Sequence, residues 1–186
     1  NICLSKFKKE DRDVKNFNGV AAGGPIDVII TLGNTEGLRF EGDADAISTL
    51  ITEVVGNKLV IRPKNSWTSW AKKYENKKIT AYVSAKTIKS LTMSGNGSMS
   101  VKGKIQENSL TGTLSGSGSI TASVDVDSFV GTISGSGKLN VSGAANEASV
   151  TISGSGSLTK KDFSVDTMVA VVSGSGSIYV NAENQI

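Results

Sequence analysis

The sequence predicts an all-β protein in which the chain winds into a parallel β-helix of about 20 residues per coil, with one short helix in its N-terminal half. Three observations lead to this fold class. A short Ser-Gly motif recurs through the second half of the 186 residues, apolar and polar residues alternate around each copy, and 21 Gly stand against only 5% aromatic residues. Alternation with period two is typical of strands that bury one face.

The repeat has the pattern Ser-Gly-x-Gly, and successive copies begin 21, 19, 19 and 20 residues apart. The copies occupy residues 94–97, 115–118, 134–137, 153–156 and 173–176. A nearly fixed period of this length is typical of stacked coils, each of which buries a face against the next. No helix-length segment fits between the copies. Each coil is therefore expected to hold a strand, a Gly bend, a second strand and a return turn.

The glycines of the motif are expected to form one corner of the β-helix, because a sharp bend between strands needs a positive φ that Gly adopts without strain. Neither a phosphate-binding loop nor a calcium-binding nonapeptide is complete in these repeats. We therefore predict a structural role for them. The predicted structural corners are Gly95, Gly97, Gly116, Gly118, Gly135, Gly137, Gly154, Gly156, Gly174 and Gly176.

A single domain is expected over residues 16–186, after an N-terminal tail or first strand at 1–15. Within it, residues 16–90 are expected to form less regular coils and residues 91–186 the regular ones. Alternating apolar residues predict strands in the less regular part, at residues 25–32, 38–41 and 58–62.

A helix is predicted at residues 44–55, where apolar residues recur with helical spacing. Its apolar face would hold Ile47, Leu50, Ile51, Val54 and Val55. An Asp at position 43 or 45 is suited to cap its start, and the Gly-Asn pair at 56 and 57 to end it. We expect this helix to cover one open end or flank of the stack.

Composition removes several kinds of chemistry. The chain has no His and one Cys, so the usual neutral-pH base, an intramolecular disulfide and a cysteine metal cluster are excluded. No catalytic, cofactor-binding or metal site is predicted. The basic residues are scattered among acidic ones, which argues against nucleic acid as a partner. No apolar run is long enough to span a membrane as a helix. Cys3 is expected to be an ordinary unpaired cysteine, or a lipid-attachment site if a lipobox precedes it.

The candidate ligand contact is a short stretch that holds both tryptophans of the chain. Trp67, Trp70 and Tyr74 stand there beside Lys72 and Lys73. Aromatic rings next to polar side chains can form a platform for a sugar ring or a protein partner. The alternative is a long loop whose tryptophans anchor it to the side of the β-helix.

Two pairs of carboxylates are the places where an enzyme site would have to lie. Asp43 with Asp45, and Asp125 with Asp127, are spaced so that each pair could share one face of a strand and hold calcium or act as acid and base. Helix capping accounts better for the first pair, and a solvated turn or strand edge for the second.

The chain resembles the head-GIN domain family of putative auto-transporter adhesins. The resemblance is carried by residues 11–17, 26–29, 38–43 and 58–62 together with the serial Ser-Gly-x-Gly motifs. It implies a right-handed parallel β-helix in an exported cell-envelope protein made with a signal peptide, often in Bacteroidetes-type bacteria. A signal peptide removed before Asn1 would fit this expectation. The family offers no catalytic residues to carry over.

Three functions are open at this point. The first is a non-catalytic envelope protein, an adhesin that binds a glycan or protein of a host or another cell, in the periplasm, on the outer-membrane surface or outside the cell. The second is a small polysaccharide-active enzyme that uses carboxylates. The third is a structural protein that stacks end to end, which an uncapped terminal coil would favour.

Overall fold

A computed structural model describes residues 6–179, with the backbone alone at residues 160 and 161. This part of the chain forms thirteen strands and two helices, which confirms the predicted all-β class. The strands are β1 (Phe7–Arg12), β2 (Gly19–Gly23), β3 (Ile26–Leu32), β4 (Gly37–Asp43), β5 (Leu50–Val55), β6 (Lys58–Pro63), β7 (Ile79–Ala85), β8 (Ser90–Gly95), β9 (Ser98–Gly116), β10 (Ser119–Gly135), β11 (Lys138–Ser153), β12 (Ser157–Ser173) and β13 (Ser177–Tyr179). The helices are α1 (Ala44–Ser48) and α2 (Trp67–Tyr74).

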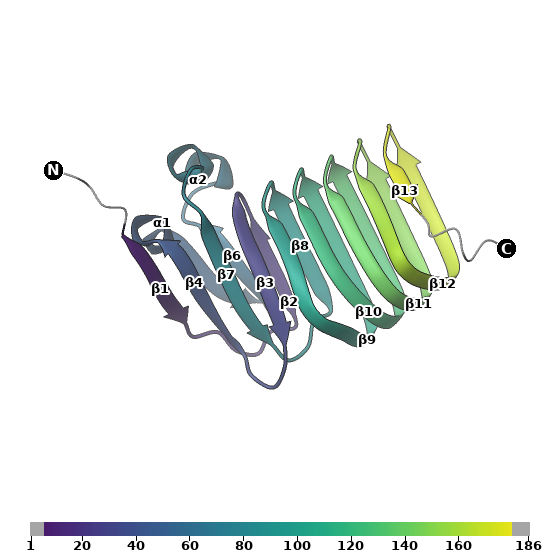
Figure 1. Ribbon diagram of the computed structural model, residues 1–186, viewed down its shortest axis with the longest axis horizontal. Helices are drawn as coiled ribbons and strands as arrows, with labels where there is room; N and C mark the ends of the chain where they lie inside the picture. Colours follow the sequence, from purple (N-terminus) through teal and green to yellow (C-terminus); the bar gives the residue numbers. More distant parts are fainter. Residues whose placement is uncertain (1–5, 180–186) are drawn as a thin grey trace.

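The strands form one continuous sheet folded into two layers, called here the front sheet and the back sheet (Figure 1). The front sheet has the order β1-β4-β7-β3-β9-β10-β11-β12-β13. The back sheet begins β5-β6-β2-β8 and continues through the second halves of β9 to β12. Each of these four long strands starts in front, curves around the lower edge and ends at the back. The parallel β-helix is confirmed, although a curve within one strand replaces the expected return turn.

The coils at the N-terminal end do not stack in sequence order. The coil formed by β2 and β3 pairs in parallel with β8 and β9, so it lies directly beside the first regular coil. On its other side, β6 pairs with β2 and β7 with β3, which places the later coil outside the earlier one. The strands β1, β4 and β5 then extend the two sheets in antiparallel pairing.

The Ser-Gly motifs stack at a single corner, as predicted, and form a row along the upper edge of the β-helix in Figure 1. The two glycines of a motif are needed for different reasons. Gly154 has a φ of +107°, and the first glycine of every other copy is likewise positive. A Cβ on Gly156 would lie 2.8 Å from the carbonyl oxygen of Gly137 and 2.6 Å from a methyl carbon of Ile133. The first glycine makes the bend, and the second lets adjacent coils approach.

A further corner carries no such motif. Gly24 joins β2 to β3 with a φ of +64°. Its N–H donates to the carbonyl oxygen of Ser94 at 2.7 Å, and its own carbonyl accepts from the N–H of Gly97 at 2.9 Å. The row of corners therefore begins one coil earlier than the repeat indicates.

The core lies between the two layers and consists of rows of inward residues. Met93, Leu114, Ile133 and Ile152 are register partners in successive coils, and all four side chains are fully buried. Burying one such side chain stabilises the fold by about 1.5–3 kcal/mol. Parallel pairing in register stacks apolar residues on apolar residues, so the repeat in the sequence becomes a continuous core.

The predicted helix at residues 44–55 is wrong over its second half. Helix α1 ends at Ser48, and the rest is strand β5, which pairs with β6. The β-branched residues of β5 favour an extended backbone. Gly56 and Asn57 have φ values of +56° and +65°, which make a two-residue hairpin turn rather than a helix end. The capping prediction is confirmed, because the carboxylate of Asp43 accepts from the N–H of Ala46.

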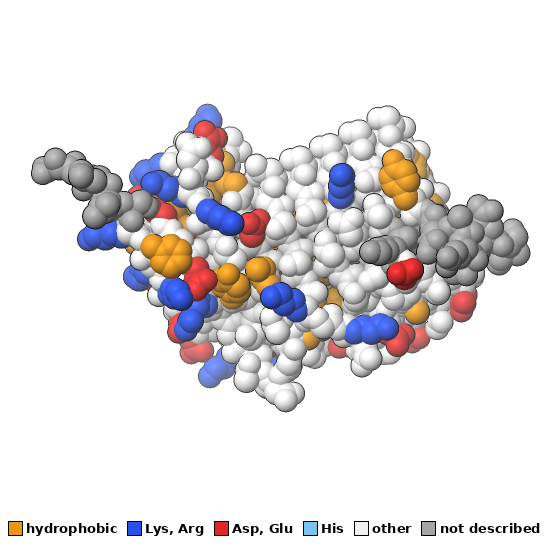
Figure 2. All heavy atoms as spheres, in the orientation of Figure 1, with side chains coloured by type: hydrophobic (Ala, Val, Ile, Leu, Met, Phe, Trp, Pro, Cys, Tyr) orange, Lys and Arg blue, Asp and Glu red, His pale blue; other side chains and the backbone are white. Residues whose placement is uncertain are grey.

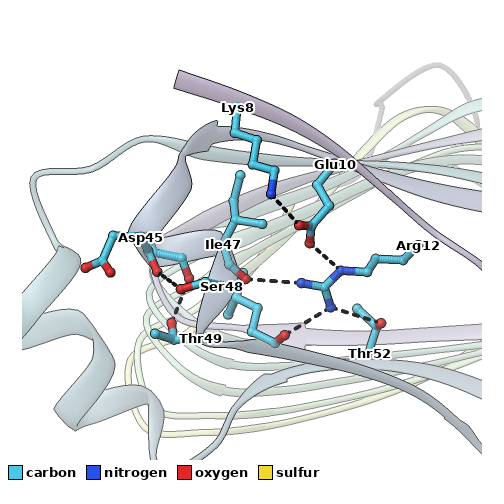
Figure 3. Close-up of polar contacts among 10 residues, drawn as sticks. Lys8, Glu10, Arg12, Asp45, Ile47, Ser48, Thr49 and Thr52 are labelled. Carbon is cyan, nitrogen blue, oxygen red and sulfur yellow. Dashed lines mark hydrogen bonds and ion pairs between the residues drawn. The ribbon is translucent and has the colours of Figure 1, made fainter. Parts of the chain in front are cut away.

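An arginine closes the N-terminal end of the β-helix, where α1 lies (Figures 1 and 3). The Arg12 guanidinium donates to the carbonyl oxygens of Ile47 at 3.1 Å and Leu50 at 3.0 Å, and to Glu10 at 2.6 Å. Hydrogen bonds from Lys8 and then Arg12 lower the pKa of Glu10 below its ordinary value. These contacts satisfy carbonyls at the end of a short helix and tie β1 of the front sheet to β5 of the back sheet.

Candidate ligand-binding surfaces

Helix α2 occupies the place that a Ser-Gly corner occupies in the regular coils, at the upper edge between β6 and β7 (Figure 1). Ser66 caps it, with its hydroxyl accepting from the N–H of Ser69 at 3.1 Å. The segment is therefore a helix, and the alternative of a long loop is wrong in that respect. Trp67, Trp70 and Tyr74 lie at positions i, i+3 and i+7, so they share one face.

The three aromatic rings pack on one another and on the end of the β-helix. The ring centroids of Trp67 and Trp70 are 5.4 Å apart, and those of Trp70 and Tyr74 are 5.2 Å apart. The Trp70 indole N–H donates to the hydroxyl of Thr49 at 2.8 Å, and the Tyr74 hydroxyl donates to Asp45 at 2.9 Å. Trp70 and Tyr74 are only 4% and 5% exposed. Their polar atoms are used inside the fold, as an anchor requires.

Trp67 has a further structural contact. A Cβ on Gly23 would lie 2.5 Å from its indole nitrogen, and a Cβ on Gly24 would overlap its ring. The indole therefore packs closely against the corner of the β2–β3 coil and covers the N-terminal end of the row of corners. Only glycine leaves room for it there.

The prediction that the Trp67–Tyr74 segment contacts a ligand is not tested by this packing. The exposed residues of the helix are Thr68, Ser69, Lys72 and Lys73, of which the two lysines carry charge. Trp70, Tyr74 and Lys73 also line a small hollow of about 190 Å³ between α2 and the end of β6. Contact through this segment would use the lysines and the hollow rather than the faces of the buried rings.

The two carboxylate pairs lie apart. Asp43 caps α1 and Asp45 accepts from Tyr74, so the first pair serves the fold. Asp125 and Asp127 lie on β10 in an open depression at the lower edge, and Asp127 accepts from the amide of Asn146 at 3.1 Å. Within the described residues no group of three His, Cys, Asp or Glu side chains is placed to hold a metal ion. Cys3 lies outside the described residues.

A groove on the front sheet was missed by the sequence analysis. It has a volume of about 500 Å³ and lies over β1, β4 and β7. Tyr82 and Ser84 of β7 line one side of it. Tyr82 is 41% exposed, although it belongs to a strand. Arg39 and Asp11 form its other wall. Figure 2 shows charged side chains gathering over this end of the sheet, whereas the face of the regular coils is mostly uncharged.

Arg39 and Asp11 form a two-pronged ion pair at the rim of the groove. The guanidinium donates to the two carboxylate oxygens at 2.7 and 3.3 Å. The hydrogen bond from Arg39 lowers the pKa of Asp11, and the same bond raises the pKa of Arg39 above its ordinary value. Both side chains are more than half exposed, so the pair lies at the surface. The two hydrogen bonds orient the planar guanidinium and carboxylate groups relative to each other, and their charges cancel.

The sequence did not reveal this groove, because its walls come from strands outside the Ser-Gly repeats. The spacing of the repeats does not predict how those strands pair. Arg39 pairs with Tyr82 and with Asp11 across antiparallel strands far apart in sequence. The usable signal was an aromatic residue at an outward position of β7, between Ala81 and Val83, which are both buried.

A two-layered β-helix with a shallow aromatic groove on one sheet is a repeat protein that presents an extended surface. The chain belongs to the family described as "Putative auto-transporter adhesin, head GIN domain", whose model matches residues 16–186. A comparison with proteins of curated function finds no match. Within residues 6–179, no helix combines the length and the apolar character needed to cross a membrane.

Solved structures of similar fold include proteins from Bacteroides and Parabacteroides. A putative adhesin from Bacteroides fragilis aligns with a TM-score of 0.59 and 16% identity over 95% of this chain and 97% of its own. A putative adhesin from Parabacteroides merdae gives the same values. A protein from Parabacteroides distasonis described as a putative lipid binding protein aligns with a TM-score of 0.56 and 18% identity, over 94% of this chain and 97% of its own. At these identities the likeness concerns the fold.

Proposed function

We propose that the chain is a non-catalytic adhesin of the bacterial cell envelope, which binds a glycan or a protein on the surface of a host or another cell. Membership in the adhesin family supports this role, and the Bacteroides and Parabacteroides relatives in fold support a Bacteroidetes-type source. The protein would be exported through a signal peptide and act in the periplasm, on the outer-membrane surface or outside the cell.

The groove beside Tyr82 is the observation that supports a binding surface on the front sheet. A half-exposed aromatic ring gains burial when a ligand covers it. The ion pair of Arg39 and Asp11 beside it presents fixed donors and acceptors. Held groups of this kind lose little conformational entropy on binding, which favours a specific contact.

The segment of α2 is a second candidate contact, carried over from the sequence. Lys72 and Lys73 are exposed there, and their charge would attract an acidic glycan with a strength that falls as salt rises. The aromatic residues beneath them would hold the helix in place.

Binding of the purified chain to host cells, to bacterial cells and to a glycan array tests the proposal. We expect the wild-type chain to bind at least one of these surfaces, and Tyr82→Ala and Arg39→Ala to bind it at least five-fold more weakly (about 1 kcal/mol or more). Val130→Ala is the matched control, because Val130 is 38% exposed on the back sheet. Binding that none of these substitutions changes would contradict the front sheet as the contact.

Catalysis by carboxylates is the competing function, and a separate assay addresses it. Polysaccharides incubated with the chain are expected to release no new chain ends. Release that disappears in Asp125→Asn or Asp127→Asn would overturn the non-catalytic proposal and locate the chemistry on β10.

A further inference from the structure

The groove beside Tyr82 continues along a single row of outward residues that crosses the front sheet. Cross-strand register links Tyr82 to Ile29, then to Ser100 and on through each regular coil. The row, called here the front row, consists of Tyr82, Ile29, Ser100, Thr121, Asn140, Thr159 and Tyr179. Neighbours along the strand point into the core where the repeat is regular: Leu139 and Val141 on either side of Asn140 are both buried. The front row therefore lies on the surface along its whole length.

Both ends of the front row carry an exposed tyrosine. Tyr82 is 41% exposed and Tyr179 is 60% exposed, whereas the third tyrosine, Tyr74 at the end of α2, is buried. Six strand spacings separate the two exposed rings, and at about 4.8 Å each they span about 29 Å. A ligand that covers both rings must therefore be extended.

The front row also passes through a second hollow. A depression of about 320 Å³ lies over Thr121, Asn140 and Thr159, and its floor is formed by Ala122 and Val141. The Asn140 amide donates to the Thr121 hydroxyl at 3.3 Å in an exposed position. One hydrogen bond does not use the full donor and acceptor capacity of these two side chains. One hollow lies beside the first tyrosine and the other lies between the two tyrosines.

The chemistry of the front row favours an uncharged ligand rich in hydroxyl groups. Between the tyrosines it holds two Thr, one Ser, one Asn and one Ile, with no charged residue. The charges beyond Tyr82 compensate each other in the Arg39–Asp11 pair. Hydroxyls and an amide can exchange hydrogen bonds with sugar hydroxyls, and the two rings offer flat apolar faces to sugar rings. A nucleic acid would instead require a line of cations.

We propose that the front row binds an extended, uncharged polysaccharide chain, with one sugar ring on Tyr82 and another on Tyr179. This inference rests on the proposed function and names its ligand class. Because one chain joins the two contacts, engaging the second ring becomes intramolecular once the first is bound, and affinity is expected to rise with chain length until both rings are covered.

The test uses linear neutral polysaccharides (a mixed-linkage β-glucan, a mannan and a xylan) in affinity electrophoresis, followed by a length series of oligosaccharides from the best of them. We expect retardation by at least one. We also expect about ten-fold or greater loss of affinity for the polymer in Tyr82→Ala and in Tyr179→Ala. Oligosaccharides too short to span the front row should lose far less affinity in Tyr179→Ala than the polymer does, because they can still bind at Tyr82.

Phe7→Ala is the matched control. Phe7 is 68% exposed on the same face of β1 as Asp11 and lies four residues from Asp11 along the strand. It lines a depression with Tyr82 but does not belong to the front row. Its removal should leave the affinity unchanged, and melting temperatures of all variants establish that they are folded. Loss of binding in Phe7→Ala equal to that in Tyr82→Ala, or affinity independent of chain length, would overturn the proposal.

Parallel binding to whole cells separates this inference from the proposed function. A chain that binds cells through the front sheet but binds no neutral polysaccharide, or binds only a charged one such as heparin, refutes the ligand class and leaves the adhesin role standing. A chain that binds neither cells nor glycans refutes both.

Discussion

The irregular coils and the regular coils of this β-helix are built differently and carry different chemistry. Residues 1–90 hold 15 of the 20 basic and 10 of the 17 acidic residues, whereas residues 91–186 hold 5 and 7. Antiparallel strands, two helices and out-of-order stacking occur only in the first region, within the described residues. The repeats place small polar residues on the outside of each regular coil. Most of the charged side chains therefore lie in the irregular coils.

The two regions also differ in how their ends are covered. At the N-terminal end α1 and Arg12 satisfy and cover the last strands. In the last described coil, Val172 is 41% exposed, whereas its register partner Ile152 is fully buried. An exposed inward side chain in a terminal coil is a feature that would favour end-to-end stacking, the third function open from the sequence.

The largest expected effect concerns the aromatic anchor of the irregular region. Trp67→Ala combined with Trp70→Ala should lower the free energy of unfolding by about 3–5 kcal/mol, because Trp70 is buried and Trp67 covers the β2–β3 corner. Lys72→Ala, on the exposed face of the same helix, should change it by less than about 0.5 kcal/mol. Urea denaturation measures both.

Cell binding by the remaining folded fraction of the double variant decides what the tryptophans do. We expect that binding to be unchanged. Wild-type stability combined with lost binding would show instead that α2 is the contact surface.

A corner glycine of the regular region comes next. Gly154→Val should lower the free energy of unfolding by about 1–3 kcal/mol through backbone strain alone, because a branched side chain is disfavoured at φ +107°. A Cβ there would also lie 2.8 Å from the carbonyl oxygen of Gly135, which adds to the loss. Gly33→Val is the control, since a Cβ at Gly33 meets open space. Equal melting temperatures for the two variants would show that the corners are not structural.

Arg12, which closes the N-terminal end of the β-helix, is expected to contribute less to stability. Arg12→Ala should lower the free energy of unfolding by about 1–3 kcal/mol, because the carbonyls of Ile47 and Leu50 lose their donor in a partly buried site. Arg62→Ala serves for comparison, since Arg62 is 42% exposed and pairs with Glu53 at the surface. The account of the cap fails if the two arginines prove equivalent in thermal melting.

The smallest effect concerns the ion pair at the groove. The hydrogen bond from Arg39 lowers the pKa of Asp11, so Arg39→Ala should raise that pKa back toward its ordinary value. A carboxyl whose pKa is lowered by folding contributes stability at neutral pH that is lost as the pH falls through the folded-state pKa. NMR titration of the Asp11 carboxyl measures the shift. An unchanged pKa in the variant would mean that the pair does not persist in solution.

The regular region could be predicted from sequence because equivalent residues of successive repeats are cross-strand partners. Ser134 and Ser153 begin successive motifs, and they are cross-strand partners in the structure. Parallel stacking at a constant interval leaves one arrangement in which the apolar residues align. Fold class, corner positions and the buried face therefore follow from the spacing.

The irregular region could not be predicted to the same depth. The apolar residues at 47–55 fit a helix as well as a strand, and the outcome was decided by pairing of β5 with β6. For α2 a signal was present, since Trp67, Trp70 and Tyr74 have helical spacing after a capping Ser66. The front-sheet groove depends on antiparallel pairing between Arg39 and Tyr82, which lie 43 positions apart, and no local pattern specifies that register.

Hydroxyl-radical footprinting of the chain, free and bound to the cells or polysaccharide it recognises, tests the central claim most directly. The account predicts that oxidation of Tyr82 and Tyr179 falls on binding, whereas Phe7 stays reactive and Tyr74 is protected in both states. Protection of Trp67 on binding, with Tyr82 and Tyr179 as reactive as before, would contradict the claim that the front sheet is the contact surface and α2 its anchor.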